Sequence, residues 1–251
     1  MSIVVIGVNH RTAPIDLLER VSVSGPELAK AITGLVSRAN IREAAVLSTC
    51  NRTEVFAVAE RFHGAYADIR DFFCELGGMQ PDELHPHLYS QHDDAAVSHL
   101  FEVAAGLDSA VLGESEILGQ VRSAWEIAQA EGGTKATLNL LFRHAIETGQ
   151  RARTEPSIRR HTASVSHAAV EMAHERLGGI AGRRVLVVGA GEMGEGIAVA
   201  LVGAGATDIT VTNRTQARAA QLAQRVSGNI VPFSQLGAAL READVLLTCT
   251  G

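Results

Sequence analysis

The stretch RRVLVVGAGEMGEGIAVALVGAGATDITVTNRT, residues 183–215, constrains the fold more than any other part of the chain. It begins with a short apolar run, passes through a glycine-rich turn into a helix-like segment, and ends in a second apolar run. Glycines at 189, 191 and 194 form the spacing GxGxxG directly after the first run. This order is typical of a βαβ unit in which backbone N–H groups at the start of the helix approach a pyrophosphate. The stretch therefore predicts a Rossmann-type dinucleotide-binding domain, the alternative being a tight turn that binds no ligand.

The end of the second strand indicates which nicotinamide cofactor binds. An NAD site usually carries Asp or Glu there, which accepts hydrogen bonds from the ribose hydroxyls. Here the strand ends in ITVTNRT, with Asn213 and Arg214 and no acid. Because a guanidinium can bind a 2′-phosphate in bidentate fashion, the sequence favours NADPH, unless Arg214 is only a solvated surface residue. The predicted cofactor-binding residues are Gly189, Ala190, Gly191, Glu192, Met193, Gly194, Asn213, Arg214 and Thr215.

The part of the chain before this unit follows a different pattern. Strands and helices are expected in the order β-α-β-β-α, at residues 2–8, 26–38, 43–49, 53–59 and 65–77. This order predicts a small antiparallel α+β layer, and the pattern is helical from Asp93 onward. The segment TEPSIRRHTAS breaks the helical pattern and is the best candidate for a linker. We therefore expect one domain at residues 1–157 and a second at residues 158–251.

Composition limits the class of protein. A hydrophobic fraction of 46% with only 6 prolines indicates a folded globular chain, and no run approaches the roughly 18 apolar residues of a membrane span. The N-terminus MSIVVIGVNHR lacks the basic segment of a secretory signal. The cysteines at 50, 74 and 249 form neither a CxxC pair nor an even set. This spacing excludes a disulfide scaffold, gives no metal site and favours a reducing cytoplasm.

The charge balance bears on nucleic-acid binding. The net charge is −6, and neither half of the chain is strongly basic, so any contact with nucleic acid requires a local patch. The best candidate is the segment of residues 143–161, and a solvated helix face is the alternative. Its basic residues are Arg143, His144, Arg151, Arg153, Arg159, Arg160 and His161.

The sequence STCNRT, residues 48–53, places a cysteine in a polar break between two apolar runs. A thiol kept only for packing usually lies inside an apolar run, whereas Cys50 lies between Thr49 and Asn51. The charge of Arg52 would favour the thiolate and could hold a carboxylate of a substrate. The turn thus predicts a nucleophilic cysteine, with a buried structural thiol as the alternative. The other two cysteines fit structural roles.

Four ordered motifs, which together span essentially the whole chain, resemble those of the glutamyl-tRNA reductases. They are GVNHRTAPIDLLERV, LSTCNRTEVFAV, HLFEVAAGLDSAVLGESEILGQVRSAW and VVGAGEMG…TNRT. The resemblance implies a mixed α/β and α+β fold: a ferredoxin-like α+β catalytic domain with added helices, followed by a Rossmann-type NADP-binding domain. It also implies NADPH-dependent reduction of glutamyl-tRNA(Glu) to glutamate-1-semialdehyde through a thioester on Cys50. This reaction is the first step of tetrapyrrole (porphyrin and haem) biosynthesis.

The same resemblance implies roles for further residues. His99 would act as a general acid/base or support the thiolate, although it lies off the predicted apolar stripe of its helix and by itself suggests an ordinary core or surface histidine. Glu114 would receive the α-amine of the substrate, unless the glutamates of this segment only favour a helix N-terminus. The implied substrate-binding residues are Thr49, Asn51, Arg52, Ser109, Glu114, Ser115, Glu116 and Gln120.

Members of this family continue into a connecting helix and a helical dimerisation domain. This chain ends in ADVLLTCTG, so we expect the cofactor domain to be truncated and the homodimer contacts to be absent. The implied partners are glutamyl-tRNA(Glu) and the downstream aminomutase, with no membrane.

Two other interpretations remain. A shikimate-dehydrogenase-like NADP oxidoreductase would explain residues 183–251 but not the cysteine turn. A catalytically silent fragment would bind tRNA or cofactor without turnover.

Overall fold

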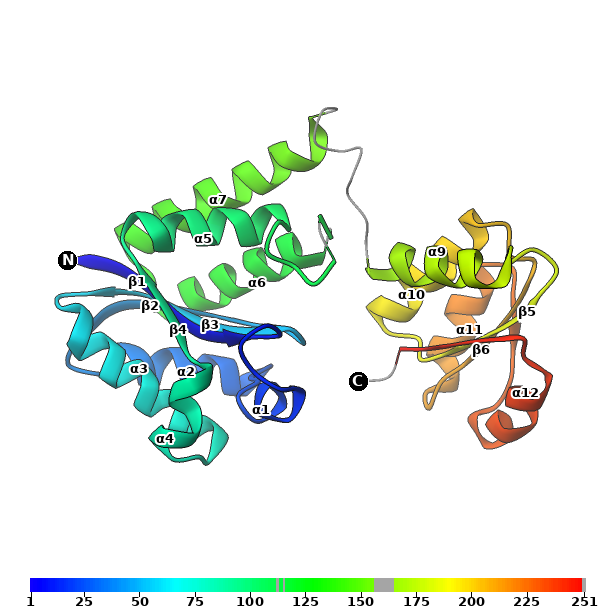
Figure 1. The fold of residues 1–251 in the computed structure, drawn as a ribbon, viewed down its shortest axis with the longest axis horizontal. Coiled ribbons are helices and arrows are strands. Elements are labelled where there is room, and N and C mark those ends of the chain that lie inside the picture. The colour runs from blue at the N-terminus through cyan, green and yellow to red at the C-terminus, as the bar shows by residue number, and fades with distance from the viewer. Residues whose placement is uncertain (112, 115, 156–164, 250–251) are drawn as a thin grey trace. The chain divides into compact units, whose positions relative to one another are not determined.

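The computed structural model describes residues 1–111, 113–114, 116–155 and 165–249. The chain divides into two compact units, Met1–Thr162 and Ala163–Gly251 (Figure 1). Each unit has its own hydrophobic core. The domain boundary expected between residues 157 and 158 lies outside the described residues.

The first unit is built on a four-stranded antiparallel sheet with the strand order β2-β3-β1-β4. Its strands are β1 (Ser2–Asn9), β2 (Ile41–Ser48), β3 (Arg52–Ala59) and β4 (Tyr89–His92). The helices α1 (Ile15–Arg20) and α2 (Pro26–Val36) connect β1 to β2, whereas α3 (Phe62–Gly77), α4 (Pro81–Leu84) and a 3-10 turn (His85–His87) connect β3 to β4. This order and topology are those of a ferredoxin-like fold, which confirms the fold predicted for the first unit.

Three further helices cover the other face of this sheet: α5 (Asp94–Ala105), α6 (Glu116–Ala130) and α7 (Ala136–Thr154). In Figure 1 they lie above the sheet, and α1 to α4 lie below it. An antiparallel sheet with one wet face alternates apolar and polar residues, whereas one covered on both faces can carry continuous apolar runs. β3 is accordingly buried along its whole length, and the polar residues Arg52, Thr53 and Glu54 are buried with it.

The second unit is a parallel sheet with the strand order β7-β6-β5-β8. Its strands are β5 (Arg184–Val188), β6 (Asp208–Thr212), β7 (Asn229–Ile230) and β8 (Val245–Thr248). Its helices are α9 (Val165–Leu177), α10 (Glu192–Gly203), α11 (Gln216–Arg225), a 3-10 turn (Phe233–Gln235) and α12 (Leu236–Glu242). The order confirms the Rossmann-type prediction, and it places the topological switch point between the carboxyl ends of β5 and β8, where such folds bind their ligands.

No helix in the described part of the chain combines the length and the apolar character that a bilayer span requires.

Candidate functional site

The turn between β2 and β3 presents Cys50 at its tip. The backbone N–H of Thr49 donates to the carbonyl of Arg52 at 2.8 Å, and the N–H of Asn51 donates to the hydroxyl of Thr49 at 3.2 Å. The carbonyl of Asn51 accepts a hydrogen bond from the N–H of His10 at 2.9 Å, which ties the turn to the end of β1. The backbone is thus fixed while the Cys50 side chain is exposed, unlike the partly buried side chains of the other two cysteines.

A cavity of about 550 Å³ lies between this turn and α1. Thr49, Cys50 and Asn51 line one side of it, and His10 and Leu18 are among the residues that line the rest. Its volume falls within the range of small-molecule sites. The cavity therefore gives the thiol a space in which a substrate group can bind.

Arg52 does not face this cavity. Its side chain is 2% exposed, and its Nη1 donates to Glu54 Oε1 at 2.8 Å. Nη2 donates to Asp108 Oδ2 at 2.9 Å and to the Asp108 carbonyl at 2.6 Å. Asp108 also pairs with the exposed Arg11. The charge of Arg52 is therefore already matched by carboxylates of the protein.

The electrostatic environment of Cys50 differs from the one that the sequence predicted. Although Cys50 is exposed as a residue, neighbouring protein atoms withdraw its thiol partly from water, and this desolvation raises the pKa of Cys50 above its usual value. The negative charges of Glu114 and Glu116 raise it further. The expectation that Arg52 favours the thiolate is wrong, because the pKa of Cys50 is raised and the charges that act on it are those of Glu114 and Glu116. The Arg52 side chain is instead buried beside Glu54 and Asp108. The predicted contact of Arg52 with a substrate carboxylate stays a prediction.

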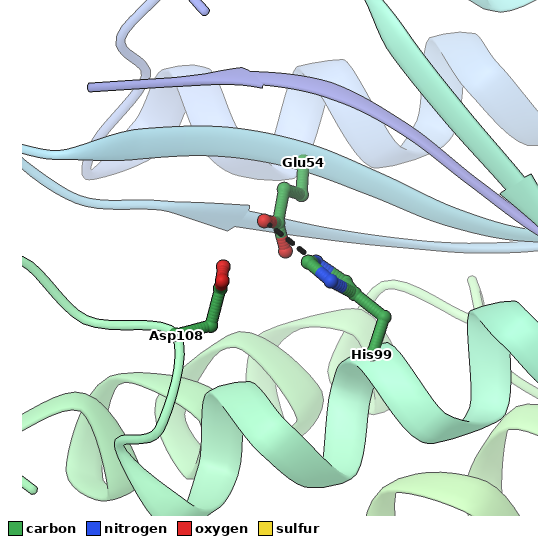
Figure 2. A group of neighbouring side chains, drawn as sticks. All are labelled: Glu54, His99 and Asp108. Atoms are coloured by element: carbon green, nitrogen blue, oxygen red, sulfur yellow. Dashed lines mark hydrogen bonds and ion pairs between the residues drawn. The ribbon is translucent and has the colours of Figure 1, made fainter. Parts of the chain in front are cut away.

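His99 belongs to the same buried network. It is 5% exposed, and its Nε2 lies 2.9 Å from Glu54 Oε1, as the dashed line in Figure 2 marks. Tyr89 donates its hydroxyl to the same oxygen, and the ring of His99 stacks on Phe56 with centroids 6.3 Å apart. The expectation that His99 lies off the apolar face of α5 is therefore wrong. Its predicted acid/base role stays a prediction.

Glu54 is the centre of this network. Burial by itself would raise the pKa of its carboxyl, but the hydrogen bond from His99 and the charge of Arg52 hold that pKa below its usual value. The ligand atoms of Glu54, His99 and Asp108 lie within 4.8 Å of one another, and Figure 2 shows Glu54 pointing from β3 toward His99 on α5, with Asp108 beside them. Because the guanidinium of Arg52 already binds both carboxylates, this cluster is an ion-pair network and not a suitable cation site.

The remaining predicted substrate residues lie between α5 and α6 or on α6. Ser109 follows Asp108 and is half-buried, and Glu114 is 8% exposed. Glu116 begins α6, and Gln120 lies one turn farther along it. Ser115 lies outside the described residues. The charges of Glu114 and Glu116 act on Cys50, but the substrate roles of this whole group stay predictions.

Five of the nine predicted cofactor residues line a cavity of about 370 Å³ at the carboxyl ends of β5, β6 and β8: Gly189, Ala190, Gly191, Asn213 and Arg214. Met193, Gly194 and Thr215 are not among the described residues that line it. The amide oxygen of Asn213 accepts a hydrogen bond from the N–H of Ala190 at 3.4 Å, and its amide nitrogen donates to the Thr215 carbonyl at 3.1 Å. Asn213 thereby joins the turn after β5 to the turn after β6. Arg214 lines the cavity together with Arg218, which the sequence analysis missed although it lies only four residues after Arg214. Met193 is half-buried, and the side chain of Glu192 is not described.

The three glycines of GxGxxG are required for different structural reasons. Gly189 has φ 110°, and a Cβ there would lie 2.3 Å from the carbonyl oxygen of Cys249. A Cβ on Gly194 would lie 2.2 Å from the carbonyl oxygen of Gly189. A Cβ on Gly191 would meet no described atom within 4 Å, and no side chain caps α10 at this residue. The fold needs the first and third glycines, whereas the second leaves open the approach of a phosphate to the helix N-terminus. These residues fit a dinucleotide.

His10 is a candidate site residue that sequence reasoning missed. It lines the cavity beside Cys50, and its Nδ1 is buried with no partner among the described residues. Burial and the charges of Arg11 and Arg52 lower the pKa of His10 below its usual value. Its place directly after β1, in a loop that would adjoin the cysteine turn, is the signal that could have identified it.

The predicted basic patch is only partly a free surface. Arg143 is exposed, Arg151 pairs with Glu155 at 3.0 Å, and Arg153 is turned inward. His144 pairs with Glu147 at 3.1 Å. Arg159, Arg160 and His161 lie outside the described residues.

Comparison with known proteins divides the chain between residues 156 and 171, near the boundary of the two units. Residues 6–156 match the family profile described as glutamyl-tRNAGlu reductase, N-terminal domain, and residues 171–251 match the profile described as shikimate/quinate 5-dehydrogenase. The glutamyl-tRNA reductase 1 of Nocardioides sp. is 42% identical over 252 residues, and the glutamyl-tRNA reductase of Bacillus subtilis is 43% identical over 251 residues. Both alignments cover 100% of this chain.

A solved structure agrees with these matches. The glutamyl-tRNA reductase from Methanopyrus kandleri is 36% identical, with a TM-score of 0.59 over 99% of this chain and 58% of that chain. The chain spans 58% and 55% of the lengths of the Nocardioides and Bacillus relatives. The resemblance predicted from the four motifs is thus confirmed on both units, and the chain belongs to the glutamyl-tRNA reductase family.

Proposed function

We propose that this protein reduces glutamyl-tRNA(Glu) with NADPH to glutamate-1-semialdehyde, the first step of tetrapyrrole biosynthesis. The observation that carries the proposal is the exposed Cys50 on a fixed turn beside a cavity of about 550 Å³, in the unit that matches the reductase profile. The shikimate-dehydrogenase alternative accounts only for residues 171–251 and leaves this turn without a purpose.

In the proposed mechanism the Cys50 thiolate attacks the carbonyl carbon of the ester that joins glutamate to its tRNA. The tRNA leaves with the ester oxygen, and a thioester remains on Cys50. NADPH, when bound, supplies a hydride to the thioester carbonyl carbon. Collapse of the resulting adduct releases the aldehyde and regenerates the Cys50 thiolate. The covalent step replaces one difficult reduction by two easier ones.

The acidic surroundings of Cys50 fit a substrate that carries its own positive charge. Glutamate esterified through its α-carboxyl keeps a free α-ammonium group, which we propose binds to Glu114. Because the charge of Glu114 raises the pKa of Cys50, an ammonium group placed there would offset that charge and favour the thiolate. The nucleophile would then be activated chiefly when the correct substrate is bound.

We propose NADPH over NADH on the charge of the cofactor cavity. Arg214 and Arg218 line it, and no described acidic side chain does. A carboxylate at the end of β6 would repel a 2′-phosphate, whereas a guanidinium can bind it in bidentate fashion.

The cellular setting and the partners belong to the same proposal. We place the protein in the cytoplasm, where charged tRNA and a reduced thiol are available. Contact with the downstream aminomutase, and a homodimer formed through the C-terminal domain of family members, stay predictions.

The test is capture of the thioester. After the native protein is mixed with glutamyl-tRNA(Glu) in the absence of NADPH, mass spectrometry should find a glutamyl group on Cys50. Cys50→Ser should abolish both this adduct and semialdehyde formation, whereas the matched control Cys74→Ser should retain them. An unmodified Cys50, with cofactor binding intact, would instead favour a silent binding fragment. Normal turnover by Cys50→Ser would exclude the proposed mechanism.

A further inference from the structure

Arg153, in the last turn of α7, makes an unusual set of contacts for an arginine. Its Nη1 donates to the carbonyl oxygens of Ala104 at 2.7 Å and Gly149 at 2.8 Å, and its Nη2 donates to the carbonyl oxygen of Glu114 at 2.7 Å. No carboxylate among the described residues forms an ion pair with it, and its Nε is buried without a partner. The hydrogen bonds of the guanidinium thus go to backbone carbonyl groups, while the charge of Glu114 acts on it through space.

The three carbonyl groups belong to different parts of the fold. Ala104 lies in the last turn of α5, where helix carbonyls lack partners within the helix and a positive charge is favourable. Gly149 lies one turn before Arg153 in α7, and a Cβ there would be 2.5 Å from the carbonyl oxygen of Ala104. This close approach of α7 to α5 lets Arg153 reach the end of α5 and, beyond it, Glu114.

Among the residues that the structure describes, few other hydrogen bonds hold the Glu114 backbone. Its own N–H donates to the carbonyl of Val111 at 3.2 Å, a local contact. The neighbouring Gly113 donates its N–H to the carbonyl of Gly106 at 2.8 Å. Gly106 has φ 79°, and a Cβ on it would lie 2.9 Å from the carbonyl oxygen of Glu114. Within the described part of the chain, Arg153 is thus the side chain that holds the backbone carbonyl of Glu114 to the helices around it.

We propose that Arg153 is a positioning residue that fixes Glu114 against the ends of α5 and α7 for the reaction at Cys50. The inference rests on the proposed function, in which Glu114 binds the α-ammonium group of the substrate and Arg153 holds Glu114 in place. It also explains why an arginine from the predicted basic patch is withdrawn from the surface.

The charge of Glu114 on Cys50 makes this role measurable. Since that charge raises the pKa of the thiol, a variant that releases Glu114 should lower the pKa of Cys50. A residue that only stabilised α7 would not change the titration of a thiol on the turn between β2 and β3.

The experiment measures the rate of iodoacetamide alkylation at Cys50 as a function of pH, in the full chain, with the modified peptide quantified by mass spectrometry. Arg153→Met, which keeps the apolar stem, should move the midpoint of the profile to lower pH. The control Arg151→Met removes the arginine two residues earlier, which pairs with Glu155 on the surface, and should leave the midpoint in place. Glu114→Gln should also lower the midpoint, and the double variant should lower it no further than Glu114→Gln does alone.

A folded Arg153→Met protein with the native midpoint, or additive shifts in the double variant, would overturn the inference. If Arg153→Met does not fold, the same alkylation profile is measured on Arg153→Lys. This variant keeps the charge but loses the forked geometry, so a midpoint below the native one supports the role and an unchanged midpoint refutes it. Alkylation uses neither tRNA nor cofactor, so its outcome is separate from that of thioester capture. Where the proposed function holds, Arg153→Met should raise KM for glutamyl-tRNA more than it lowers kcat.

Discussion

At the scale of single residues, alternation along β3 explains the buried charges beneath the cysteine turn. Side chains two apart in a strand point to the same face, so Arg52, Glu54 and Phe56 all point toward the layer of α5 to α7. There Arg52 contacts Glu54, and the ring of His99 lies on Phe56. Breaking such a buried pair by removing one partner typically costs 3–5 kcal/mol, because the other charge remains buried. The network therefore fixes the base of the turn that carries Cys50.

Replacement of Glu54 tests this network. Because the folded pKa of Glu54 lies below its usual 4.5, its stabilising contribution is fully present above pH 4.5 and is lost as the pH falls through the lower folded value. Glu54→Gln should lower the free energy of unfolding by about 3 kcal/mol at neutral pH. The difference between native protein and variant should shrink as the pH falls. Urea unfolding, followed by the fluorescence of Trp125, the single tryptophan, measures both effects.

The control for this variant is Glu60→Gln, at an exposed carboxylate that pairs with Arg42 on the surface. It should change stability little at any pH, since exposed ion pairs contribute little. A Glu54→Gln protein as stable as the native one at neutral pH would show that the buried network does not hold this unit together.

Replacement of Arg214 tests the choice of cofactor. Loss of a charge-assisted phosphate contact costs on the order of 1.5–3 kcal/mol, or roughly ten- to a hundredfold in affinity. Arg214→Ala should therefore weaken NADPH binding by that factor and leave NADH binding nearly unchanged, as measured by titration calorimetry. Arg218→Ala, in the same cavity, shows whether the second guanidinium shares the phosphate. Equal losses for both cofactors would refute the assignment.

The residues that sequence reasoning placed correctly are those whose surroundings are local. Cys50 lies in a polar turn because its two strands are adjacent in the chain, and the glycine turn is set by one strand and the helix after it. Arg52 and His99 were misjudged because their partners come from distant segments: Asp108 lies 56 residues after Arg52, and Glu54 lies 45 residues before His99. No periodicity within one segment indicates such a pairing.

At the scale of elements, the strand–turn–helix unit of β5 and α10 separates glycines that the fold requires from the glycine that we propose leaves room for the cofactor. Gly191→Ala should leave the unfolding temperature nearly unchanged, because its Cβ would meet no described atom within 4 Å. The same substitution should weaken NADPH binding, because the added methyl group would occupy the path of the pyrophosphate.

The matched variant is Gly194→Ala. Its Cβ would lie 2.2 Å from the carbonyl oxygen of Gly189, so it should lower the unfolding temperature markedly. Thermal unfolding by circular dichroism and calorimetric titration with NADPH together separate the two effects. A Gly191→Ala protein that binds NADPH normally would mean that no cofactor phosphate lies at this turn.

Elements that the sequence did not predict are short or polar. β4 has the sequence YSQH and only four residues, with none buried, so it carries no apolar alternation. It forms a strand because β1 offers it a free edge. α1 contributes only Leu17 and Leu18 to the core, yet it supplies a wall of the Cys50 cavity. Both elements depend on contacts with distant parts of the chain, which no local sequence pattern indicates.

At the scale of the whole molecule, the two cores are composed of separate parts of the chain, and each binding cavity lies within one unit. The Cys50 cavity is formed by residues 10–51, and the cofactor cavity by residues 188–249. A ligand that binds one folded unit and not its unfolded form stabilises that unit by mass action, by about 2.7 kcal/mol at a concentration one hundred times its Kd. Cofactor should therefore raise the unfolding midpoint of the second unit and leave that of the first unit unchanged.

Trp125 makes this prediction measurable, because the single tryptophan lies on α6 in the first unit. Circular dichroism follows the unfolding of both units, whereas tryptophan fluorescence follows only the first. NADP⁺ should raise the midpoint of the transition that is seen by circular dichroism but not by fluorescence, which is that of the second unit. The fluorescence midpoint, which follows the first unit, should stay in place. The oxidised cofactor is used because the reduced nicotinamide fluoresces, and Arg214→Ala should reduce the upward shift at the same cofactor concentration. If NADP⁺ instead raised both midpoints equally, the chain would unfold as one cooperative body, and cofactor binding would be coupled to the stability of the unit that carries Cys50.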